Sequence, residues 1–191
     1  MLKRGTAHNS RASAGPSCAV AWAVRVCSAC ILGLSARDEL LELWEQTGSR
    51  LTLVMMNVLC AEALYRLQDD DEAFRRLDVA EAETARQEGL LAPDIWRVRG
   101  RLLARGGQRS AAEAAYCQAI ERAQAQHALS LELRAALDLY ELRAQDEAAH
   151  ESRAALTVLL NRFPQGLDRP ELVRARAIVR ARGDPAIVHG K

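Results

Sequence analysis

Apolar residues recur at helical spacing along most of this chain and predict a series of short helices. Residues 51–67 are apolar over most of a helical circumference, which is typical of a helix buried between neighbours. One-sided apolar faces predict further helices at 35–47, at 70–88 and twice within 94–124, and a last helix at about 169–182. The pattern therefore predicts an all-α protein.

The two helices within 94–124 are predicted to fold back on each other across a glycine turn. Gly106 and Gly107 interrupt the helical pattern. Ser110, followed three residues later by Glu113, has the spacing of a capping box at the start of the second helix. The glycines and the capping residues together therefore predict the turn, in addition to the polar character of the segment.

Residues of matching size lie on the faces that these two helices turn toward each other. The sets are Trp96, Gly100 and Leu103 on the first helix, and Ala112, Tyr116 and Ala119 on the second. A glycine costs a helix about 1 kcal/mol relative to alanine, so we expect the second backbone to come close at Gly100. The ordered set resembles a tetratricopeptide repeat, although Arg99 stands where a leucine usually precedes the small residue.

The same size pattern recurs along the chain. An offset of 39 residues relates the later members of this set to an earlier one: Ala61, Leu64, Ala73, Leu77 and Ala80. For a third unit, an offset of 40, which gives Tyr140, Arg143, Ser152, Leu156 and Leu159, competes with an offset of 36, which gives Ala136, Leu139, Ala148 and Ala155. The recurrence predicts a tetratricopeptide-like solenoid of about three antiparallel helix pairs plus flanking helices.

The chain is expected to have three parts. Residues 1–34 form a basic and apolar leader that we expect to be disordered or poorly defined, residues 35–182 form the helical repeat domain, and residues 183–191 form a tail. Hydrophobic residues make up 49% of the chain but aromatic residues only 4%, so the core is expected to consist of leucine, alanine and valine. This is typical of stacked helices.

Charge is unevenly distributed and excludes some classes of partner. Residues 38–165 carry 15 arginines and 22 acidic residues, a net charge of −7, which argues against direct nucleic-acid binding. Lysine occurs only at Lys3 and Lys191, so the chain cannot contain the lysine-bearing loop that cradles nucleotide phosphates.

Residues 17–34 are the one candidate for a membrane or targeting segment. Arg25 interrupts this apolar run, and a mid-membrane arginine costs roughly 2.5–3.5 kcal/mol, so no membrane partner is expected. Cys27 and Cys30 have metal-site spacing without the further ligands that zinc requires. We expect no metal, no cofactor, reduced thiols and a cytoplasmic location. The alternative is a membrane-tethered or metal-linked adaptor that acts through this segment.

Five segments carry a more specific resemblance: 43–51, 59–83, 96–107, 112–137 and the tail around 163–172, of which 130–136 (SLELRAA) is the most distinctive. Residues 36 to about 180 look like the C-terminal tetratricopeptide region of bacterial multidomain signalling proteins. Those proteins join a class III adenylate or guanylate cyclase, or a DNA-binding module, to an AAA-type ATPase. The resemblance implies a regulatory scaffold that associates with ATPase or cyclase modules. Neither activity is implied, because both modules are missing here. A remnant of a longer gene is an alternative.

A groove is expected where the first helix of each pair lines one face of such a repeat array. The candidate residues are Glu62, Tyr65, Arg66, Arg97, Arg101, Arg105, Arg134 and Glu141. Arg97, Arg101 and Arg105 follow one another at four-residue spacing and form one stripe, which could capture the carboxylates of an acidic peptide. The alternative is that arginine is simply the basic surface residue of an almost lysine-free chain.

Catalytic residues are not predicted. A hydrolase that uses Glu141, Glu151 and His150 is the enzymatic alternative, but no nucleophile elbow, zinc-binding helix or phosphate loop accompanies them. The sequence therefore predicts a non-enzymatic module for protein–protein interaction, whose partner is a protein or peptide, and an acidic one if the arginine stripe forms a groove.

Overall fold

The computed structural model describes residues 46, 50–84, 89, 91–144, 146, 148–164 and 168–181. Within them the chain is all-helical, with seven helices and no strand, as the apolar pattern predicted. The helices are α3 (Arg50–Leu67), α4 (Asp70–Thr84), α5 (Ala92–Arg105), α6 (Arg109–Ala125), α7 (Leu129–Arg143), α8 (Ala149–Leu160) and α9 (Pro170–Arg180). The leader 1–34, the tail 183–191 and the helix expected at 35–47, apart from Gln46, lie outside the described residues.

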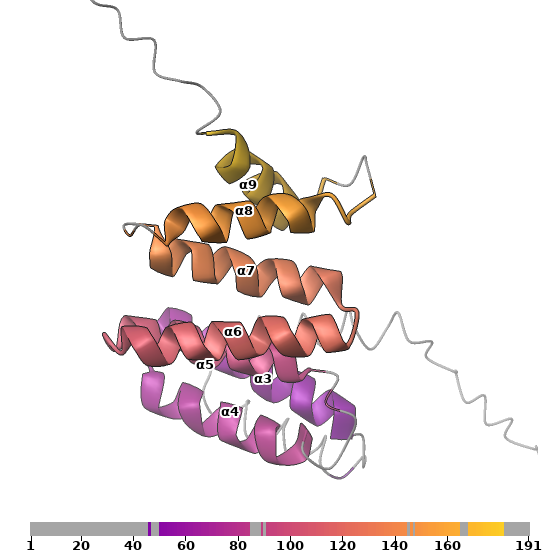
Figure 1. The fold of residues 1–191 in the computed structure, drawn as a ribbon. Coiled ribbons are helices and arrows are strands. Elements are labelled where there is room, and N and C mark those ends of the chain that lie inside the picture. The colour runs from indigo at the N-terminus through magenta and orange to yellow at the C-terminus, as the bar shows by residue number, and fades with distance from the viewer. Residues whose placement is uncertain are drawn as a thin grey trace, which may run out of the picture.

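The helices are arranged in two layers (Figure 1). α3, α5, α7 and α9 each contact the next and form what we call the first-helix layer. α4, α6 and α8 form the outer layer. Each packs between two successive members of the first-helix layer, and among the described residues these three helices do not contact one another. Because α4, α6 and α8 stay apart, the first-helix layer alone is continuous from one end of the stack to the other.

The core is built from the small and large residues that recur along the sequence. Ala61, Ala73 and Ala80 are fully buried, and so are Ala112 and Ala119. Leu64, Leu77 and Tyr116 are buried beside them, as the 39-residue offset predicted, whereas Trp96 and Leu103 are half-buried. Small residues at matching positions let paired helices approach closely, and the larger ones fill the space between the layers.

The third unit uses parts of both competing registers. On α8 the offset of 40 is correct, because Ser152, Leu156 and Leu159 are buried while Ala155 is exposed. On α7, Ala136 and Leu139, which belong to the offset of 36, are buried instead. Burying a leucine removes more apolar surface from water than burying an alanine, so α8 orients by Leu156 and Leu159.

Three helices end in the same backbone motif. After α3, α5 and α6 a residue adopts a positive φ, namely Gln68 (63°), Gly107 (74°) and His127 (53°). Around Gly107, the Gln108 N–H donates to the Leu103 carbonyl at 2.9 Å and the Gly107 N–H donates to the Ala104 carbonyl at 3.1 Å. The equivalent two bonds close the turns at Gln68 and His127. This arrangement satisfies carbonyls at each helix end and reverses the chain.

The predicted capping box at Ser110 is wrong, whereas α4 does have a side-chain cap, at Asp69. α6 begins at Arg109, and its N-cap Gln108 provides no side-chain hydrogen bond, so Ser110 already lies within the first turn. The tight turn at Gly107 brings the helix start forward, and the Gln108 carbonyl already accepts from the Ala112 N–H. At α4, by contrast, Asp69 Oδ1 accepts a hydrogen bond from the Glu72 N–H at 3.3 Å.

Two further expectations need correction. α5 begins at Ala92, two residues earlier than predicted, because Pro93 suits the first turn of a helix. The group that approaches Gly100 is the ring of Tyr116 and not the backbone of α6. Across the described segments, no helix combines the length and apolarity that crossing a membrane requires.

Candidate functional site

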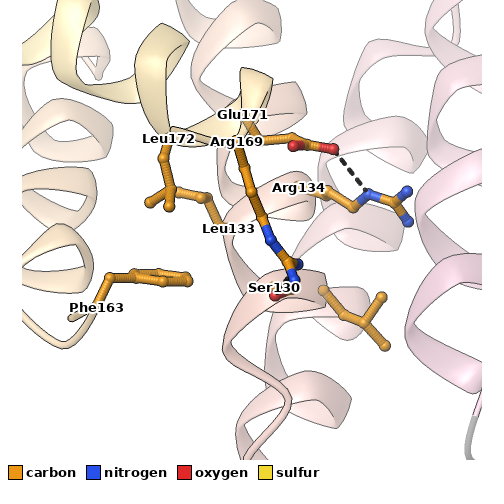
Figure 2. Close-up of a pocket in the computed structure, with 8 residues that line it drawn as sticks. Ser130, Leu133, Arg134, Phe163, Arg169, Glu171 and Leu172 are labelled. Carbon is orange, nitrogen blue, oxygen red and sulfur yellow. Dashed lines mark hydrogen bonds and ion pairs between the residues drawn. The ribbon is translucent and has the colours of Figure 1, made fainter. Parts of the chain in front are cut away.

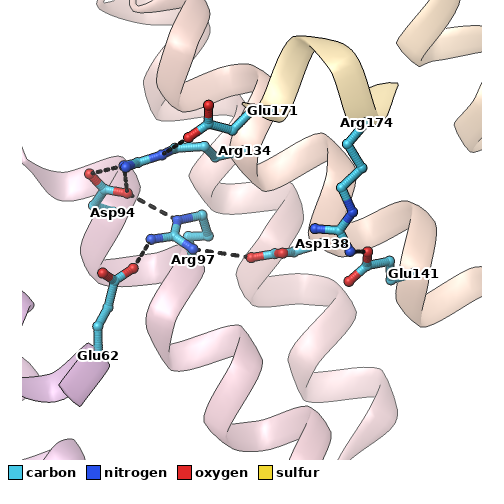
Figure 3. A network of polar contacts seen from close by, with 8 residues as sticks. All are labelled: Glu62, Asp94, Arg97, Arg134, Asp138, Glu141, Glu171 and Arg174. Atoms are coloured by element: carbon cyan, nitrogen blue, oxygen red, sulfur yellow. Dashed lines mark hydrogen bonds and ion pairs between the residues drawn. The ribbon is translucent and has the colours of Figure 1, made fainter. Parts of the chain in front are cut away.

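The first-helix layer carries a network of charged side chains that crosses it from α3 to α9. Figure 3 shows its eight members, which are Glu62 on α3, Asp94 and Arg97 on α5, Arg134, Asp138 and Glu141 on α7, and Glu171 and Arg174 on α9. Five of them are acidic and three are arginines, so this face is not the basic surface that the arginine stripe suggested. We call this set the acid–arginine network.

Arg97 is the centre of the network. Its guanidinium bonds to Glu62 on α3, to Asp94 Oδ1 at 3.0 Å and to Asp138 Oδ2 on α7 at 3.2 Å. The Arg97 side chain is only 7% exposed. Burial by itself lowers the pKa of Arg97, but attraction to the three carboxylates outweighs burial and raises it, so Arg97 remains charged. The positive charge of Arg97 is therefore neutralised by carboxylates of the same chain and is not available to a ligand.

The network continues from α5 through α7 to α9. Arg134 Nη1 lies 3.2 Å from Asp94 Oδ1, and Arg134 Nε lies 3.6 Å from Glu171 Oε1. Further along α7, Glu141 pairs with Arg174. These pairs are more exposed than the Arg97 cluster and each contributes about 0–1 kcal/mol. They nevertheless neutralise most of the charge on this face.

A pocket of about 400 Å³ opens on the same layer, and we call it the Tyr65 pocket. Three helices of the first-helix layer and one of the outer layer contribute to its lining: Tyr65, Arg101, Ala104, Arg105, Tyr116, Asp138, Glu141 and Leu142. A volume of this size is within the range of pockets that take small ligands or parts of a peptide.

Arg101 is the distinctive cation of the Tyr65 pocket. Its guanidinium carbon lies 4.6 Å from the centroid of the Tyr65 ring, a cation–π contact, and among the described residues Arg101 forms no ion pair. Arg105 stacks on the same ring at 3.9 Å, but it is also bonded to Asp70 and to the Tyr65 carbonyl. Arg101 therefore retains a positive charge that could meet a ligand.

Tyr116 contributes a hydroxyl to the pocket. Burial raises the pKa of Tyr116, and the nearby Asp138 raises it further, so the phenol stays protonated and can donate a hydrogen bond. No described residue accepts a bond from it. The Tyr65 pocket thus offers one unneutralised guanidinium and one hydroxyl donor, together with the Asp138 and Glu141 carboxylates, which already have arginine partners.

The structure divides the predicted groove residues among different environments. Four line the Tyr65 pocket: Tyr65, Arg101, Arg105 and Glu141. Glu62 and Arg97 belong to the acid–arginine network, and Arg134 lines a separate hollow between α7 and α9. Arg66 is exposed on α3 and lines neither. The stripe of three arginines therefore exists on α5, but its members play different parts.

Sequence reasoning missed Asp94, Asp138 and Tyr116 as members of this face. A usable signal was the sequence separation of opposite charges. Arg97 meets Glu62 at a separation of 35 and Asp138 at 41, and Arg134 meets Asp94 at 40. These values are close to one repeat, and residues one repeat apart lie on neighbouring helices of the same layer. Complementary charges at that separation predict partners.

The described part of the chain contains two cysteines, Cys60 and Cys117. No group of three metal-ligating side chains occurs there, and Cys27 and Cys30 lie outside it. Cys60 is buried and Cys117 is half-buried, and burial raises the pKa of the Cys117 thiol, which keeps it protonated and weakly reactive.

In comparisons with protein-family models, curated proteins and solved structures, nothing matches this chain.

Proposed function

We propose that this chain is a non-enzymatic interaction module that binds a segment of a partner protein along its first-helix layer. The observation that carries this proposal is Arg101, a guanidinium in an open pocket with no acidic partner among the described residues. Its neighbours on the stripe, Arg97 and Arg105, are already neutralised by carboxylates of this chain. Because Arg101 alone of the three stripe arginines has no acidic partner among the described residues, the Tyr65 pocket favours recognition of an anion.

The helical stack supports a tetratricopeptide-like solenoid as the scaffold for this function. The continuous layer is made by the first helix of each pair, and the recurring alanines are buried where the pairs meet. Such a layer presents side chains from several repeats to one extended ligand. This sequence resembles bacterial signalling proteins that contain ATPase and cyclase modules. We therefore include in the proposal a regulatory scaffold role with such modules as partners.

The charges around the Tyr65 pocket restrict the chemical class of ligand that it can bind. We propose that an acidic side chain binds Arg101 and the Tyr116 hydroxyl in this pocket, where a charged hydrogen bond contributes about 1.5–3 kcal/mol. Asp138 and Glu141 line the same pocket and repel further acids. We therefore propose a partner segment with one acidic residue at this position and not a long acidic run. This revises the acidic-peptide prediction that was drawn from three equivalent arginines.

The enzymatic alternative has weaker support. Glu141 lines the Tyr65 pocket, whereas His150 lines another hollow with Tyr140, Ala177 and Ile178. Glu141 is also paired with Arg174. General acid–base catalysis needs its groups within hydrogen-bond reach of one substrate. An adaptor that acts through residues 17–34 remains an alternative function, and that segment lies outside the described residues.

Selection from a library of random peptides tests the proposal. The wild-type chain serves as bait, and Arg101→Glu serves as the variant that reverses the charge. Arg97 is unsuitable for this purpose, because a glutamate there would add a fourth acid to a buried cluster and unfold the protein. Arg180→Glu, an exposed position on α9, is the matched control.

We expect enriched peptides to share one aspartate or glutamate and to bind Arg101→Glu about 10- to 100-fold more weakly than wild type. Binding to Arg180→Glu should equal that of wild type. Peptides that bind the wild type and Arg101→Glu with equal affinity would refute the proposed site.

A further inference from the structure

A second hollow lies between the start of α7 and the start of α9. Its volume is about 240 Å³, and we call it the Phe163 pocket. Its lining consists of Ser130, Leu131, Leu133, Arg134, Phe163, Arg169, Glu171 and Leu172. Figure 2 shows the side chains of Leu133 and Leu172 beside each other, with the long side chain of Arg169 reaching across toward Ser130. The pocket shares Arg134 and Glu171 with the acid–arginine network but no residue with the Tyr65 pocket.

The floor of the Phe163 pocket is apolar and fixed. Leu133 and Leu172 are 2% and 1% exposed and belong to the core that joins α7, α8 and α9. Phe163 packs against the same core while remaining half-buried. Because these side chains are held by packing, the hollow is preformed, and its accessible hydrocarbon comes from the half-buried Leu131 and Phe163.

The mouth of the pocket has one cation that is not neutralised. Arg134 is bonded to Asp94 and lies beside Glu171, so its charge is balanced within the protein. Arg169 is exposed, and its Nη1 donates to Ser130 Oγ at 3.4 Å, a long bond to a neutral group. No described carboxylate pairs with Arg169. Apolar surface and free positive charge therefore meet at one small site.

We propose that the Phe163 pocket binds a single leucine-sized apolar side chain that lies next to a carboxylate. The volume is below the range of about 300–1,000 Å³ that drug-sized ligands and cofactors occupy, which favours one side chain over a larger molecule. The half-buried Leu131 and Phe163 side chains contact the hydrocarbon part. The Arg169 guanidinium turns from Ser130 to the carboxylate and forms a charged bond that is stronger than the neutral one it replaces.

This site goes beyond the proposed function, because it uses other residues and does not need Arg101. An extended partner could occupy both pockets, since residues of α7 line each of them: Leu133 for one and Glu141 for the other. The eight residues between them correspond to about 12 Å along the helix axis, which about four extended residues can span. The Phe163 pocket should nevertheless bind a small probe alone.

Nuclear magnetic resonance titration of the full chain with two matched probes tests this inference. The probes are N-acetyl-leucine, which carries the carboxylate, and N-acetyl-leucinamide, which does not. We expect both to shift the amide signals of Ser130, Leu131 and Leu172, with N-acetyl-leucine bound about tenfold more tightly. Arg169→Gln should reduce the affinity for N-acetyl-leucine to that for the amide, and Arg180→Gln on the same helix should leave it unchanged.

Arg101→Glu serves as the second control and separates the two sites. Probe binding that persists in Arg101→Glu supports the Phe163 pocket whether or not the peptide selection succeeds. Equal affinity for both probes, insensitivity to Arg169→Gln, shifts at other residues or no shifts at all would each overturn the inference. The exposed position of Arg169 means that the Gln variant keeps the fold, which its amide spectrum will check.

Discussion

A β-carbon placed on Gly100 would lie 2.6 Å from Cε1 of Tyr116. Real β-carbons do not make contacts this short, so the Tyr116 ring occupies the space that any other residue at position 100 would fill. The pair joins α5 to α6, and its Tyr116 also lines the Tyr65 pocket. Packing of the repeat and geometry of the candidate site therefore depend on the same contact.

Gly100→Ala should destabilise the protein by about 1–3 kcal/mol, because overpacking outweighs the gain of about 1 kcal/mol in helix propensity. Urea unfolding measures the change. Gly106→Ala is the matched control, since a β-carbon there meets only two carbonyl oxygens, at 3.5 and 3.6 Å, and it should be nearly neutral. In a Tyr116→Leu background, Gly100→Ala should lose its cost. Equal stability of the two alanine variants in the wild-type background would contradict the contact.

Arg97→Met should cost about 3–5 kcal/mol, because it leaves Glu62, Asp94 and Asp138 close together without their shared cation. The stability of Arg97→Lys should lie between that of Arg97→Met and that of the wild type, since an ammonium group cannot reproduce the three directional bonds of the guanidinium. The same urea experiment on Arg99→Met provides the comparison. Arg99 pairs with acids that are 65% and 45% exposed, so its loss should cost below about 1 kcal/mol. Similar costs for the two methionine variants would show that the Arg97 cluster is not special.

Gln68→Gly should stabilise the protein by about 1 kcal/mol. Gln68 has a φ of 63° at the end of α3, a conformation that costs a residue with a β-carbon about 1–2 kcal/mol and a glycine almost nothing. Gly107 occupies the same place one repeat later, with a φ of 74°, and Gly107→Ala should lose a similar amount. The midpoint of thermal unfolding should rise in the first variant and fall in the second. A Gln68→Gly variant less stable than wild type would contradict this account of the turn.

The stability of the protein should fall at alkaline pH in a way that depends on Tyr116. Burial raises the pKa of Tyr116 above the ordinary value of 10.0, so the unfolded chain releases the phenol proton first. The contribution of the protonated Tyr116 phenol to the free energy of unfolding is therefore complete below pH 10. It is lost as the pH rises from 10 toward the pKa of Tyr116 in the folded protein. In that window this group contributes a slope of up to about 1.4 kcal/mol per pH unit. Tyr116→Phe should show a correspondingly flatter profile in urea unfolding. Parallel profiles for the two proteins would contradict the buried phenol.

Periodicity predicted the helices and most of the core, because side-chain size and spacing are local properties of the sequence. Ala61, Ala73 and Ala112 were placed in the core from their offset alone, and all are fully buried. The third unit could not be resolved this way, since Leu156 and Ala155 both fit an apolar pattern and only their competition for buried space decides which one faces inward. The start of α6 was misplaced because a tight glycine turn overrode the sequence signal at Ser110.

The candidate site was predicted only in outline, because charge alone does not reveal pairing. Spacing correctly placed Arg97 and Arg101 on one face of α5, but it could not show that the first is enclosed by three acids and the second is not. That distinction depends on which helices are neighbours and on the position of Asp138 on α7. The arginine stripe therefore predicted the correct helix face, and the packing of α3 and α7 against α5 determines which arginine is free to bind a ligand.

Photo-crosslinking in cells tests the central claim, that a partner segment occupies the first-helix layer. A photoreactive amino acid replaces Glu141, which lines the Tyr65 pocket and is exposed, or Ala114, which is exposed on α6 in the outer layer. We predict a protein adduct from position 141 that disappears when Arg101→Glu is added, and none from position 114. An adduct from position 114 alone, or one from position 141 that survives Arg101→Glu, would contradict the account.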